Sequence, residues 1–312
     1  MATRRQQRRQ QVSRQRTSRF LVIMAGVLAW AGLSLVMYPT AAAWVSMYNQ
    51  SLAVESYEQQ VVDASPAPDD QIALAEEYNS KLSSGAILAA NANVPTGSGS
   101  LADDELNYWK LLDAGNGVMG RVQIPAISVD LPIYHGTTDE ALLAGAGHLQ
   151  GTSLPVGGED THSVLTAHRG LANARMFTDL DKVKEGDTFS VTTFGHTVTY
   201  QVIETKVVEP EDTASLRQEA GKDLVTLVTC TPLGINTHRI LVTGTRVTPT
   251  PPEDEIRGEG PVVVPFPWWF VVYAGVTLAG IILIWWFLRR GNKDRTPRQR
   301  RSPEGTPDDA TS

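Results

Sequence analysis

The sequence predicts a mainly β domain of the sandwich or barrel type, preceded by helices and flanked by two transmembrane helices. Seven short runs rich in β-branched residues follow one another from residue 118, with only brief helical segments between them. This pattern is typical of antiparallel β sandwiches and barrels and not of alternating βαβ units. Two uncharged apolar stretches lie near the two ends of the chain. With 312 residues, of which 42% are hydrophobic and 20% charged, the chain is too apolar to be disordered.

The two apolar stretches, residues 20–38 and 266–288, are each close to the ~20 residues that cross about 30 Å of hydrocarbon as a helix. The second begins and ends with paired tryptophans, which suit the headgroup interfaces of a bilayer. A buried core helix is a poor alternative, because few soluble helices are apolar all round for this length. For the first stretch we favour an uncleaved signal anchor. A signal peptide cleaved near Ala41-Ala42-Ala43 is the alternative.

Charge is distributed unevenly along the chain, although the formal net charge is only −7. The N-terminal tail, residues 1–19, contains arginines and no acid, and the C-terminal tail, residues 289–312, is also basic. Because Lys and Arg accumulate on the cytoplasmic side of a membrane, both tails are expected in the cytoplasm and residues ~45–260 outside it. The acidic balance of the middle region argues against a general nucleic-acid binder.

Between the first apolar stretch and the β region, the sequence predicts an N-terminal helical segment over residues 45–86. Two stretches with helical spacing, 46–62 and 69–82, are separated by the helix breaker Ala-Ser-Pro-Ala-Pro at 64–68. We therefore expect a helical stalk or hairpin. Residues 87–105 are rich in Gly, Ser, Asn and Asp and are expected to form an open loop.

The β domain is expected to occupy residues 106–250. Its strands are expected at 118–124, 127–134, 163–167, 187–193, 197–208, 223–230 and 239–247. Brief helical segments are expected at 137–144 and 211–219. Residues 251–265 contain several prolines and an acidic run, so we interpret them as an extended linker to the second apolar stretch.

Cys230 is the single cysteine of the chain, so an extracytoplasmic domain can form no internal disulfide. An inert buried thiol, an intermolecular disulfide and a reactive nucleophile remain open. Cys230 ends one predicted strand and Arg239 begins the next, which makes them neighbours across the mouth of a turn. A guanidinium lowers the pKa of a nearby thiol and can stabilise an oxyanion, which is typical of catalysis. A surface ion pair is the plain alternative for Arg239.

Acyl transfer on a thiol also needs a histidine. Six are available: His135, His148, His162, His168, His196 and His238. His168 is preferred because it closes an alternating strand and precedes Arg169-Gly170, which indicates a turn at the rim of the sheet, where functional residues concentrate. His238 adjoins Arg239 but points to the opposite face of the strand, so a structural role is favoured. No metal and no cofactor are expected, because a second cysteine and a His-Glu-x-x-His motif are both missing.

Four stretches of the chain closely resemble the sortases, and in particular the pilin-polymerising class C sortases of Gram-positive actinobacteria. They read GVMGRVQIPAISVDLPIYHGT, GHLQGTSLPVGG, THSVLTAHRG and LVTLVTCTPLGINTHRILVTGTR, and the resemblance covers roughly residues 50–250. The family signature is Thr-Leu-x-Thr-Cys, followed by an arginine and preceded by a histidine. It is matched by Thr226, Leu227, Thr229, Cys230, Arg239 and His168. A second membrane helix after the domain is also a class C trait.

This resemblance implies an eight-stranded β-barrel that cleaves a Leu-Pro-x-Thr-Gly sorting signal between Thr and Gly. Cys230 would be the nucleophile, His168 the general acid and base, and Arg239 the group that holds the substrate carbonyl and the oxyanion. Residues of the signature that would bind substrate or support the site are Thr229, Thr226 and Leu227. The thioester would pass to an amine, which in class C members is usually a pilin lysine. The expected partners are therefore sorting-signal surface proteins or pilins, at the cell membrane of a Gram-positive bacterium.

One departure from the family concerns the lid that many class C sortases carry before the barrel. Its Asp-Pro-aromatic triplet does not occur in residues 85–115, although the Gly- and Ser-rich loop 88–105 lies in the lid position. We therefore expect 88–105 to be a mobile or differently anchored lid. The missing triplet also keeps open a housekeeping-type sortase that attaches proteins to peptidoglycan.

Two other classes of protein fit the sequence less well. Papain-like enzymes and cell-wall amidases place Cys before His, whereas here His168 precedes Cys230. The L,D-transpeptidases place His-Gly directly before Cys, and here Val228-Thr229 occupies those positions. A non-enzymatic, membrane-anchored β domain would make Cys230 a buried core thiol.

Overall fold

The computed structural model describes residues 2–82 and 106–293, and it describes side chains from 20 to 82 and from 106 to 289. The chain forms two compact units. Residues up to Tyr38 and from Pro267 onward make one unit, and Pro39–Phe266 make the other. The loop expected at 87–105, with its lid-like part 88–105, lies outside the described residues.

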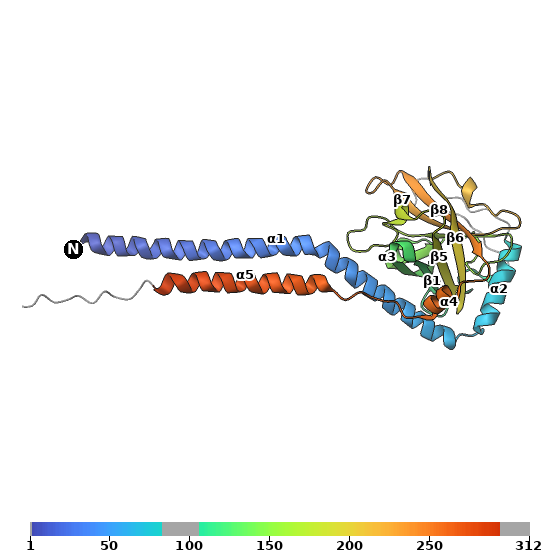
Figure 1. Cartoon of the computed structure of the whole chain (residues 1–312), viewed down its shortest axis with the longest axis horizontal. Coiled ribbons are helices and arrows are strands. Elements are labelled where there is room, and N and C mark those ends of the chain that lie inside the picture. The colour runs from blue at the N-terminus through green and yellow to red at the C-terminus, as the bar shows by residue number, and fades with distance from the viewer. Residues whose placement is uncertain (1, 83–105, 294–312) are drawn as a thin grey trace, which may run out of the picture. The chain divides into compact units, whose positions relative to one another are not determined.

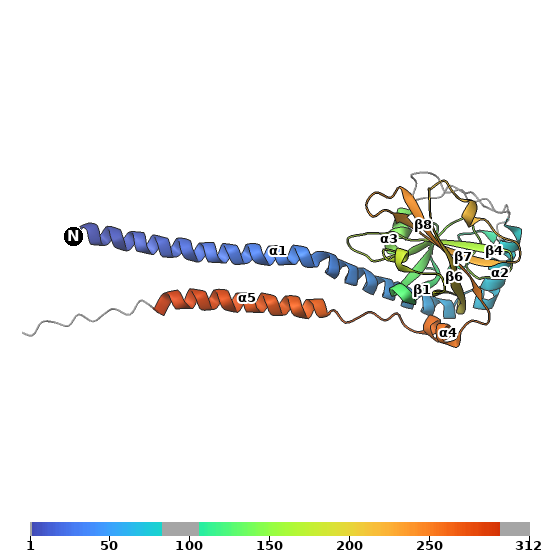
Figure 2. The same ribbon diagram turned by 45° about the horizontal axis from the view of Figure 1, so that its top comes forward.

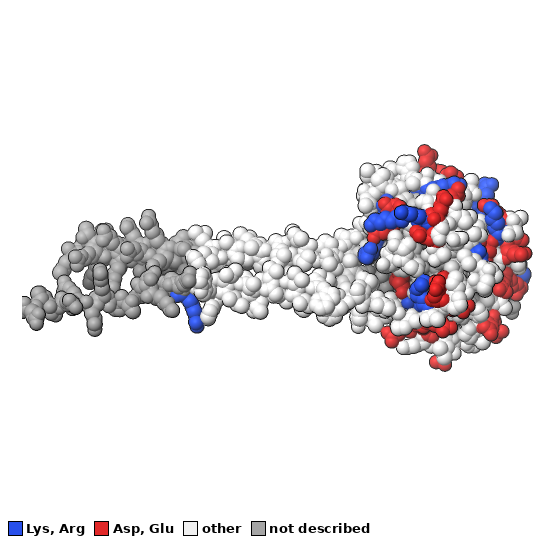
Figure 3. Space-filling model, viewed as in Figure 1, with Lys and Arg blue, Asp and Glu red and all other residues white. Residues whose placement is uncertain are grey.

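The first unit contains two apolar helices, the first part of α1 (Ala2–Val62) and α5 (Trp268–Lys293). Both are long and apolar enough to cross a membrane. Apart from Arg289, their described side chains in this unit carry no charge (Figure 3). The helices contact each other, because the Tyr273 hydroxyl lies 2.7 Å from Ser34 Oγ, which itself donates to the Trp30 carbonyl. Such interhelical hydrogen bonds stabilise helix pairs in an apolar environment.

In the second unit, the end of α1 and helix α2 (Pro68–Lys81) form the predicted helical segment. The predicted break between two helices is confirmed, because α1 ends at Val62 and α2 begins with proline, whose missing N–H is not needed at a helix start. α2 lies along the barrel (Figures 1 and 2). Buried Asn79 donates to the Leu154 carbonyl at 3.0 Å and accepts from the Leu154 amide at 2.7 Å. The Asn79 side chain therefore binds α2 to the rest of the domain through both the N–H and the carbonyl of Leu154.

Eight strands close into one barrel in the order β1-β2-β3-β4-β7-β8-β6-β5, with β5 pairing back to β1 (Figures 1 and 2). The strands are β1 (Val118–Ile124), β2 (Val129–His135), β3 (Ala146–His148), β4 (Thr161–Thr166), β5 (Thr188–Thr193), β6 (His196–Val208), β7 (Asp223–Thr231) and β8 (His238–Val247). The mainly β fold and the eight-stranded barrel implied by the family resemblance are confirmed.

Short helical elements connect the strands. They are η2 (Pro125–Ile127), α3 (Asp139–Ala144), η3 (Leu180–Lys182) and η4 (Ala214–Leu216). The helical segment predicted at 137–144 contains α3, which begins where Thr138 Oγ1 accepts a hydrogen bond from the Ala141 amide. The one predicted at 211–219 contains only the single turn η4.

Two features of the sheet differ from the expectation. Strand β3 is missed by the sequence reasoning, because three residues are too few to show an alternation of apolar and polar side chains. The sheet is also not purely antiparallel, because β3 pairs in parallel with β2, and β7 pairs in parallel with β4. Parallel pairing brings the C-terminal ends of β4 and β7 to the same edge of the barrel.

The expectation of an extended linker at 251–265 is wrong for the first half of that segment, because helix α4 (Pro252–Glu259) forms there. Two of the prolines that suggested an extended chain, Pro251 and Pro252, lie at the start of this helix, where proline is well tolerated. α4 packs on β5 and β6, and buried Asp254 accepts a hydrogen bond from Thr199 Oγ1 at 2.8 Å. The segment after the barrel is therefore part of the domain.

Buried Arg121 on β1 binds the segment that precedes the barrel in the chain and the segment that follows it. Its guanidinium forms a bidentate pair with Asp130, with distances of 2.7 and 2.8 Å, and a third contact with Glu58 of α1 at 3.1 Å. It also donates to the Gly258 and Gly260 carbonyls at 3.3 and 2.6 Å. One side chain thus joins α1, the sheet and the end of α4.

Candidate active site

The edge of the barrel where β4 and β7 end and β8 begins brings together the three residues favoured by the sequence. β4 and β7 run parallel with Thr166 opposite Val228, and β7 pairs with β8 so that Cys230 lies directly opposite Arg239. Residues directly opposite each other on antiparallel strands have Cβ atoms about 5 Å apart. The structure thus places the thiol and the guanidinium as neighbours, as the turn between their strands predicts.

His168 lies two residues beyond the last ladder pair of β4. Two hydrogen bonds continue the contact between the segments past that pair. The Ala167 amide donates to the Val228 carbonyl at 3.2 Å, and Thr229 Oγ1 donates to the Ala167 carbonyl at 2.8 Å. Carrying the same register two residues past the ladder puts His168 level with Cys230.

Cys230 and Arg239 belong to the face of the sheet opposite the main core. Side chains alternate between the two faces of a strand, so Cys230 shares its face with Val228, and Arg239 shares its face with Leu241. Val228 and Leu241 belong to a small apolar cluster that is separate from the main core of the domain. The cluster, here called the outer cluster, consists of Leu149, Val164, Leu216, Val228 and Leu241, with Val208 packed against it. It supports the reactive edge with buried apolar side chains.

Arg239 is held by backbone groups of the turn before it. Its Nη1 donates to the Asn236 carbonyl at 3.0 Å and to the His238 carbonyl at 3.1 Å. Among residues 20–82 and 106–289, the other guanidinium donors have no acceptor, and neither Cys230 Sγ nor the His168 imidazole has a hydrogen-bond partner. The side chains at this edge are therefore oriented by their strands and turns and not by bonding to one another.

The half-buried His168 ring has a shifted pKa. Burial lowers the pKa below its usual 6.5, because the charged imidazolium loses solvation, and the carboxylate of Asp139 on α3 raises it in part. Burial therefore favours the neutral form of the imidazole in the free protein. A neutral imidazole can accept a proton, and a lowered pKa makes its charged form a better proton donor.

The three further residues of the signature support the strands. Thr229 joins β7 to the segment that contains His168. Thr226 Oγ1 lies 2.7 Å from His162 Nε2 and 2.9 Å from Thr243 Oγ1, which makes a buried polar chain across β4, β7 and β8. Leu227 is fully buried in the main core, where it packs among other apolar side chains.

Three of the remaining histidines are buried and hydrogen-bonded. His148 Nε2 lies 2.8 Å from the Ser153 carbonyl, Nδ1 lies 3.0 Å from the Tyr108 hydroxyl, and burial lowers the pKa of His148 to about 4. Burial also lowers the pKa of His135 and of His162. Within the described part of the chain, no group of three or more His, Cys, Asp or Glu side chains is arranged to hold a metal ion.

The other two histidines lie on the surface. His196 Nε2 lies 3.1 Å from Asp69 Oδ1, which joins β6 to the start of α2. His238 is exposed and lies beside the Thr237 hydroxyl, 2.9 Å from Nδ1.

Sequence reasoning missed one polar group beside the reactive edge. Arg169 figures in the sequence only as part of a turn signal, yet its side chain is 8% exposed and bonds to Thr231, the residue after Cys230. Its place directly after His168 was the only available signal. A single sequence shows that Arg169 follows the histidine but not where the guanidinium points.

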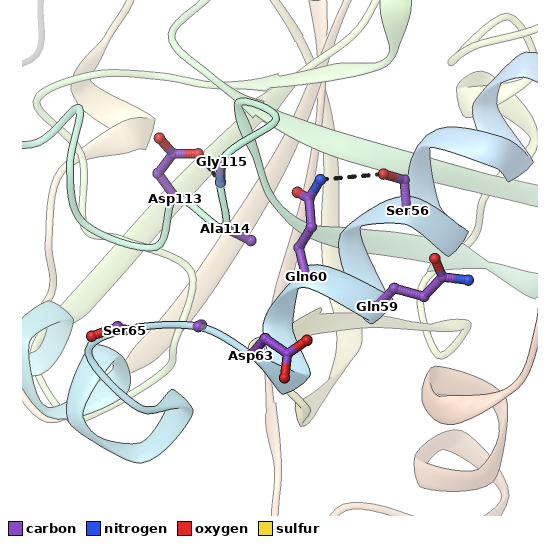
Figure 4. Close-up of a pocket in the computed structure, with 9 residues that line it drawn as sticks. Ser56, Gln59, Gln60, Asp63, Ser65, Asp113, Ala114 and Gly115 are labelled. Carbon is purple, nitrogen blue, oxygen red and sulfur yellow. Dashed lines mark hydrogen bonds between the residues drawn. The ribbon is translucent and has the colours of Figure 1, made fainter.

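A cavity of about 500 Å³ lies away from this edge, between the end of α1, the turn that follows it and the loop before β1 (Figure 4). Its lining includes Gln60, Asp63, Ser65 and Asp113. Asp113 is occupied by the amides of its own loop, because its Oδ1 accepts from Gly115 and Gly117. None of the three residues favoured for catalysis lines this cavity.

Comparison with known proteins shows which of them share this barrel. A family model described as the sortase domain matches residues 122–247. The chain is similar to sortase C-1 from Actinomyces oris, with 49% identity and a TM-score of 0.53, over 58% of this chain and 99% of that one. It is also similar to sortase C from Streptococcus pneumoniae, with 37% identity and a TM-score of 0.56, over 64% of this chain and 98% of that one. The latter structure is described for its insights into catalysis and pilin substrate specificity.

Among curated relatives, Sortase D of Bacillus subtilis is 30% identical over 132 residues, which are 41% of this chain and 64% of that protein. The chain spans between 47% and 64% of the length of the curated relatives that it matches. The closed barrel and the likeness to class C sortases over nearly their whole solved length define a sortase fold. The chain belongs to the sortase family.

Proposed function

We propose that this protein is a membrane-anchored cysteine transpeptidase of the class C type. It cleaves a Leu-Pro-x-Thr-Gly sorting signal between Thr and Gly and transfers the acyl group to an amine, which we propose is a pilin lysine. The observation that carries this proposal is the strand register. Cys230 lies opposite Arg239 in it, and extending the β4–β7 register two residues past its last pair puts His168 level with Cys230. This is the arrangement of a nucleophile, an oxyanion donor and a proton-transfer group that acyl transfer requires.

In the first half-reaction, the Cys230 thiolate attacks the threonine carbonyl carbon of the sorting signal. The carbonyl oxygen becomes an oxyanion, and the Arg239 donors that have no acceptor among the described residues stabilise it. The bond from carbon to the glycine nitrogen then breaks, and protonated His168 gives its proton to that nitrogen. The products are a thioester on Cys230, a free glycine amine and a neutral imidazole.

In the second half-reaction, a neutral amine attacks the thioester carbonyl. His168 is now neutral and takes the proton that the amine loses, while the Cys230 thiolate leaves. After the second half-reaction the enzyme is back in its starting state, with His168 as the imidazolium and Cys230 as the thiolate. The new bond is an amide, and with a lysine side chain as the amine it is an isopeptide.

Two observations support pilins as substrates. The solved structures that the chain resembles are class C sortases, with identities of 37% and 49%, and that of Streptococcus pneumoniae is described in connection with pilin substrates. In addition, Leu233 and Ile235 in the turn between β7 and β8 are 52% and 68% exposed. Apolar side chains beside a nucleophile favour an apolar peptide segment such as the Leu-Pro of a sorting signal.

We also propose that the barrel lies outside the cytoplasmic membrane of a Gram-positive bacterium, with both termini in the cytoplasm. The basic residues before the first apolar helix and after the second support this topology through the positive-inside rule. A substrate with a sorting signal emerges on the same side of the membrane.

The test of this function is intact-mass spectrometry of the detergent-solubilised full chain incubated with a Leu-Pro-x-Thr-Gly peptide. The wild type should gain the mass of the peptide truncated after threonine, and Cys230→Ala should gain nothing. Adding a lysine-containing peptide should discharge the adduct and yield a branched product.

Arg239→Lys tests the oxyanion role, because lysine keeps the charge but presents a different donor geometry. Loss of one oxyanion donor lowers kcat by about 10²- to 10³-fold. An unchanged kcat in Arg239→Lys would remove Arg239 from the mechanism. Absence of any adduct on a wild-type protein whose Cys230 alkylates in the folded state would overturn the proposed function itself.

A further inference from the structure

We infer that Arg169 is a positioning residue that fixes His168 relative to the strand of Cys230. The inference concerns the same site as the proposed function and rests on it. Arg169 directly follows His168, and its bonding partner Thr231 directly follows Cys230. One guanidinium therefore links the two residues adjacent to the proposed acid and the proposed nucleophile.

The Arg169 guanidinium has a separate partner in each of three directions. Its Nη1 donates to Thr231 Oγ1 at 2.8 Å, its Nε donates to the Thr178 carbonyl at 3.1 Å, and its Nη2 lies 2.7 Å from Asp181 Oδ2. The Arg169 side chain is 8% exposed, while that of Asp181 is 47% exposed. The cation is thus buried at the β7 end and neutralised at the solvent end, which limits the cost of burying it.

The bond to Thr231 lies where the sheet no longer holds the two segments together. The last ladder pair of β4 and β7 is Thr166 with Val228, and beyond it the segments share the two hydrogen bonds of Ala167. Thr231 lies three residues past Val228, so its hydrogen bond with Arg169 is the next contact between the two segments along the same edge. Without it, the two hydrogen bonds of Ala167 alone would set the spacing between His168 and Cys230.

The loop after His168 is folded back so that the arginine can make this tie. The Phe177 amide donates to the His168 carbonyl at 3.0 Å, and the Gly170 amide donates to Thr178 Oγ1 at 3.1 Å. Arg169 Nε closes the same loop through the Thr178 carbonyl. The loop is therefore a closed structure bonded to β7 through one side chain.

A planar guanidinium is the side chain that can make this arrangement. Its donors diverge in fixed directions, so it can bond at once to a hydroxyl, a carbonyl and a carboxylate. Lysine has a single ammonium at the end of a flexible stem and cannot hold three separated acceptors in the same geometry. Replacement of Arg169 by lysine should therefore preserve the positive charge but no longer hold His168 in place relative to Cys230.

The experiment compares Arg169→Met, Arg169→Lys, Thr231→Val and the double variant Arg169→Met/Thr231→Val in the detergent-solubilised full chain, with His168→Ala as the reference for loss of the histidine. Arg175→Ala is the matched control, because Arg175 lies in the same loop and forms an exposed ion pair with Asp179. Two readouts are measured at a temperature where thermal melting shows each variant to be folded. They are kcat and KM for the sorting-signal peptide, and the rate of Cys230 alkylation as a function of pH.

A misplacement of about 1 Å in a catalytic group lowers the rate by about 10²-fold, so Arg169→Met should lower kcat by about 10- to 100-fold with little change in KM. Arg169→Lys should not restore kcat, and the double variant should be no slower than Arg169→Met, because both changes break the same bond. The alkylation profile of Arg169→Met should approach that of His168→Ala, while Arg175→Ala should match the wild type.

The inference is overturned if folded Arg169→Met keeps the wild-type kcat and alkylation profile, or if Arg175→Ala loses as much as Arg169→Met. It is also overturned if Arg169→Met lowers the melting temperature but leaves kcat and the alkylation profile unchanged. A wild-type protein that forms no acyl adduct would defeat the proposed function, and the alkylation profiles would still decide whether Arg169 positions His168.

Discussion

Each of the three candidate catalytic side chains at the barrel edge is positioned through the backbone. The turn carbonyls of Asn236 and His238 hold Arg239, and the Phe177 amide holds the carbonyl of His168. Cys230 is set by its place opposite Arg239 in the ladder. Such a site is preorganised before substrate binds, since its geometry follows from strand register and loop structure.

Asp139 gives a prediction about pH dependence at the scale of one residue. Its negative charge stabilises the imidazolium of His168 and so raises its pKa against the larger lowering by burial. Asp139→Asn should therefore lower the pKa of His168 further. Activity needs one proton shared between the thiol and the imidazole and falls at acid pH when both are protonated, so the acid limb of kcat/KM should move to lower pH.

The measurement is kcat/KM for the sorting-signal peptide from acid to alkaline pH in wild type, Asp139→Asn and Glu140→Gln. Glu140 is the matched control, because it lies in the same first turn of α3 and does not contribute to the pKa shift of His168. An acid limb that stays in place or moves to higher pH in Asp139→Asn would show that this carboxylate does not act on the histidine.

At the scale of single residues, the sequence predicts which residues form the candidate site better than it predicts the side chains that surround them. Cys230, His168 and Arg239 are selected by residue type, chain order and strand ends, and the structure places them at one edge. Arg169 and Asp139 are not selected. Their roles depend on the direction of one side chain and on the position of a helix, neither of which has a periodic signal in a single sequence.

At the scale of the elements, strands with clear alternation are predicted well and elements without it are not. β6 and β7 are long enough to show period-two patterning, whereas β3 has three residues. α4 shows the opposite problem, because its prolines suggest a linker while its burial depends on contacts with a distant part of the sheet. Parallel pairing of β4 with β7 likewise has no local signal, since the two strands are far apart in the sequence.

The packing of α4 on the sheet gives a prediction about stability. A Cβ at Gly258 would lie 2.6 Å from Thr192 Oγ1 and would also meet Thr197 Oγ1, and these two hydroxyls bond to each other at 2.9 Å. Gly258→Ala should therefore push α4 from β5 and β6 and lower the free energy of unfolding by about 1–3 kcal/mol.

Urea unfolding of the detergent-solubilised protein measures this loss. Glu259→Ala, at the exposed neighbouring position, is the control and should stay within about 0.5 kcal/mol of the wild type. Equal stability of Gly258→Ala and wild type would mean that α4 does not pack on the sheet as described.

At the scale of the whole molecule, the two apolar helices are predicted from length and composition alone, because spanning a bilayer imposes a simple requirement on a continuous stretch of chain. Their contact with each other through Tyr273 and Ser34 is not predicted, since it depends on which helix faces meet. The barrel is predicted as a class from its short strands, and its count of eight strands comes from the family resemblance. The order of the strands is seen only in the structure, because it depends on pairings between distant parts of the chain.

The single native cysteine gives a direct test of the proposed topology. In a Cys230→Ala background, one new cysteine is introduced at a time: Ser18→Cys in the N-terminal tail, Ser80→Cys on exposed α2, or Ser302→Cys in the C-terminal tail. A membrane-impermeant maleimide should label Ser80→Cys in intact cells. It should label Ser18→Cys and Ser302→Cys only after the membrane is permeabilised. Labelling of either tail variant in intact cells would refute the hairpin topology.

The parallel pairing of β4 with β7 also has a consequence for how the protein matures. Ala167 and Thr229, which join the two segments, are 62 residues apart in the chain, so their contact requires a long loop to close. An unfolded chain therefore holds Cys230 apart from His168 until this non-local contact forms. With the proposed function, the ability to form a thioester would appear together with the folded barrel. Refolding from urea with timed alkylation should show Cys230 reactivity rising in step with barrel closure and not before it.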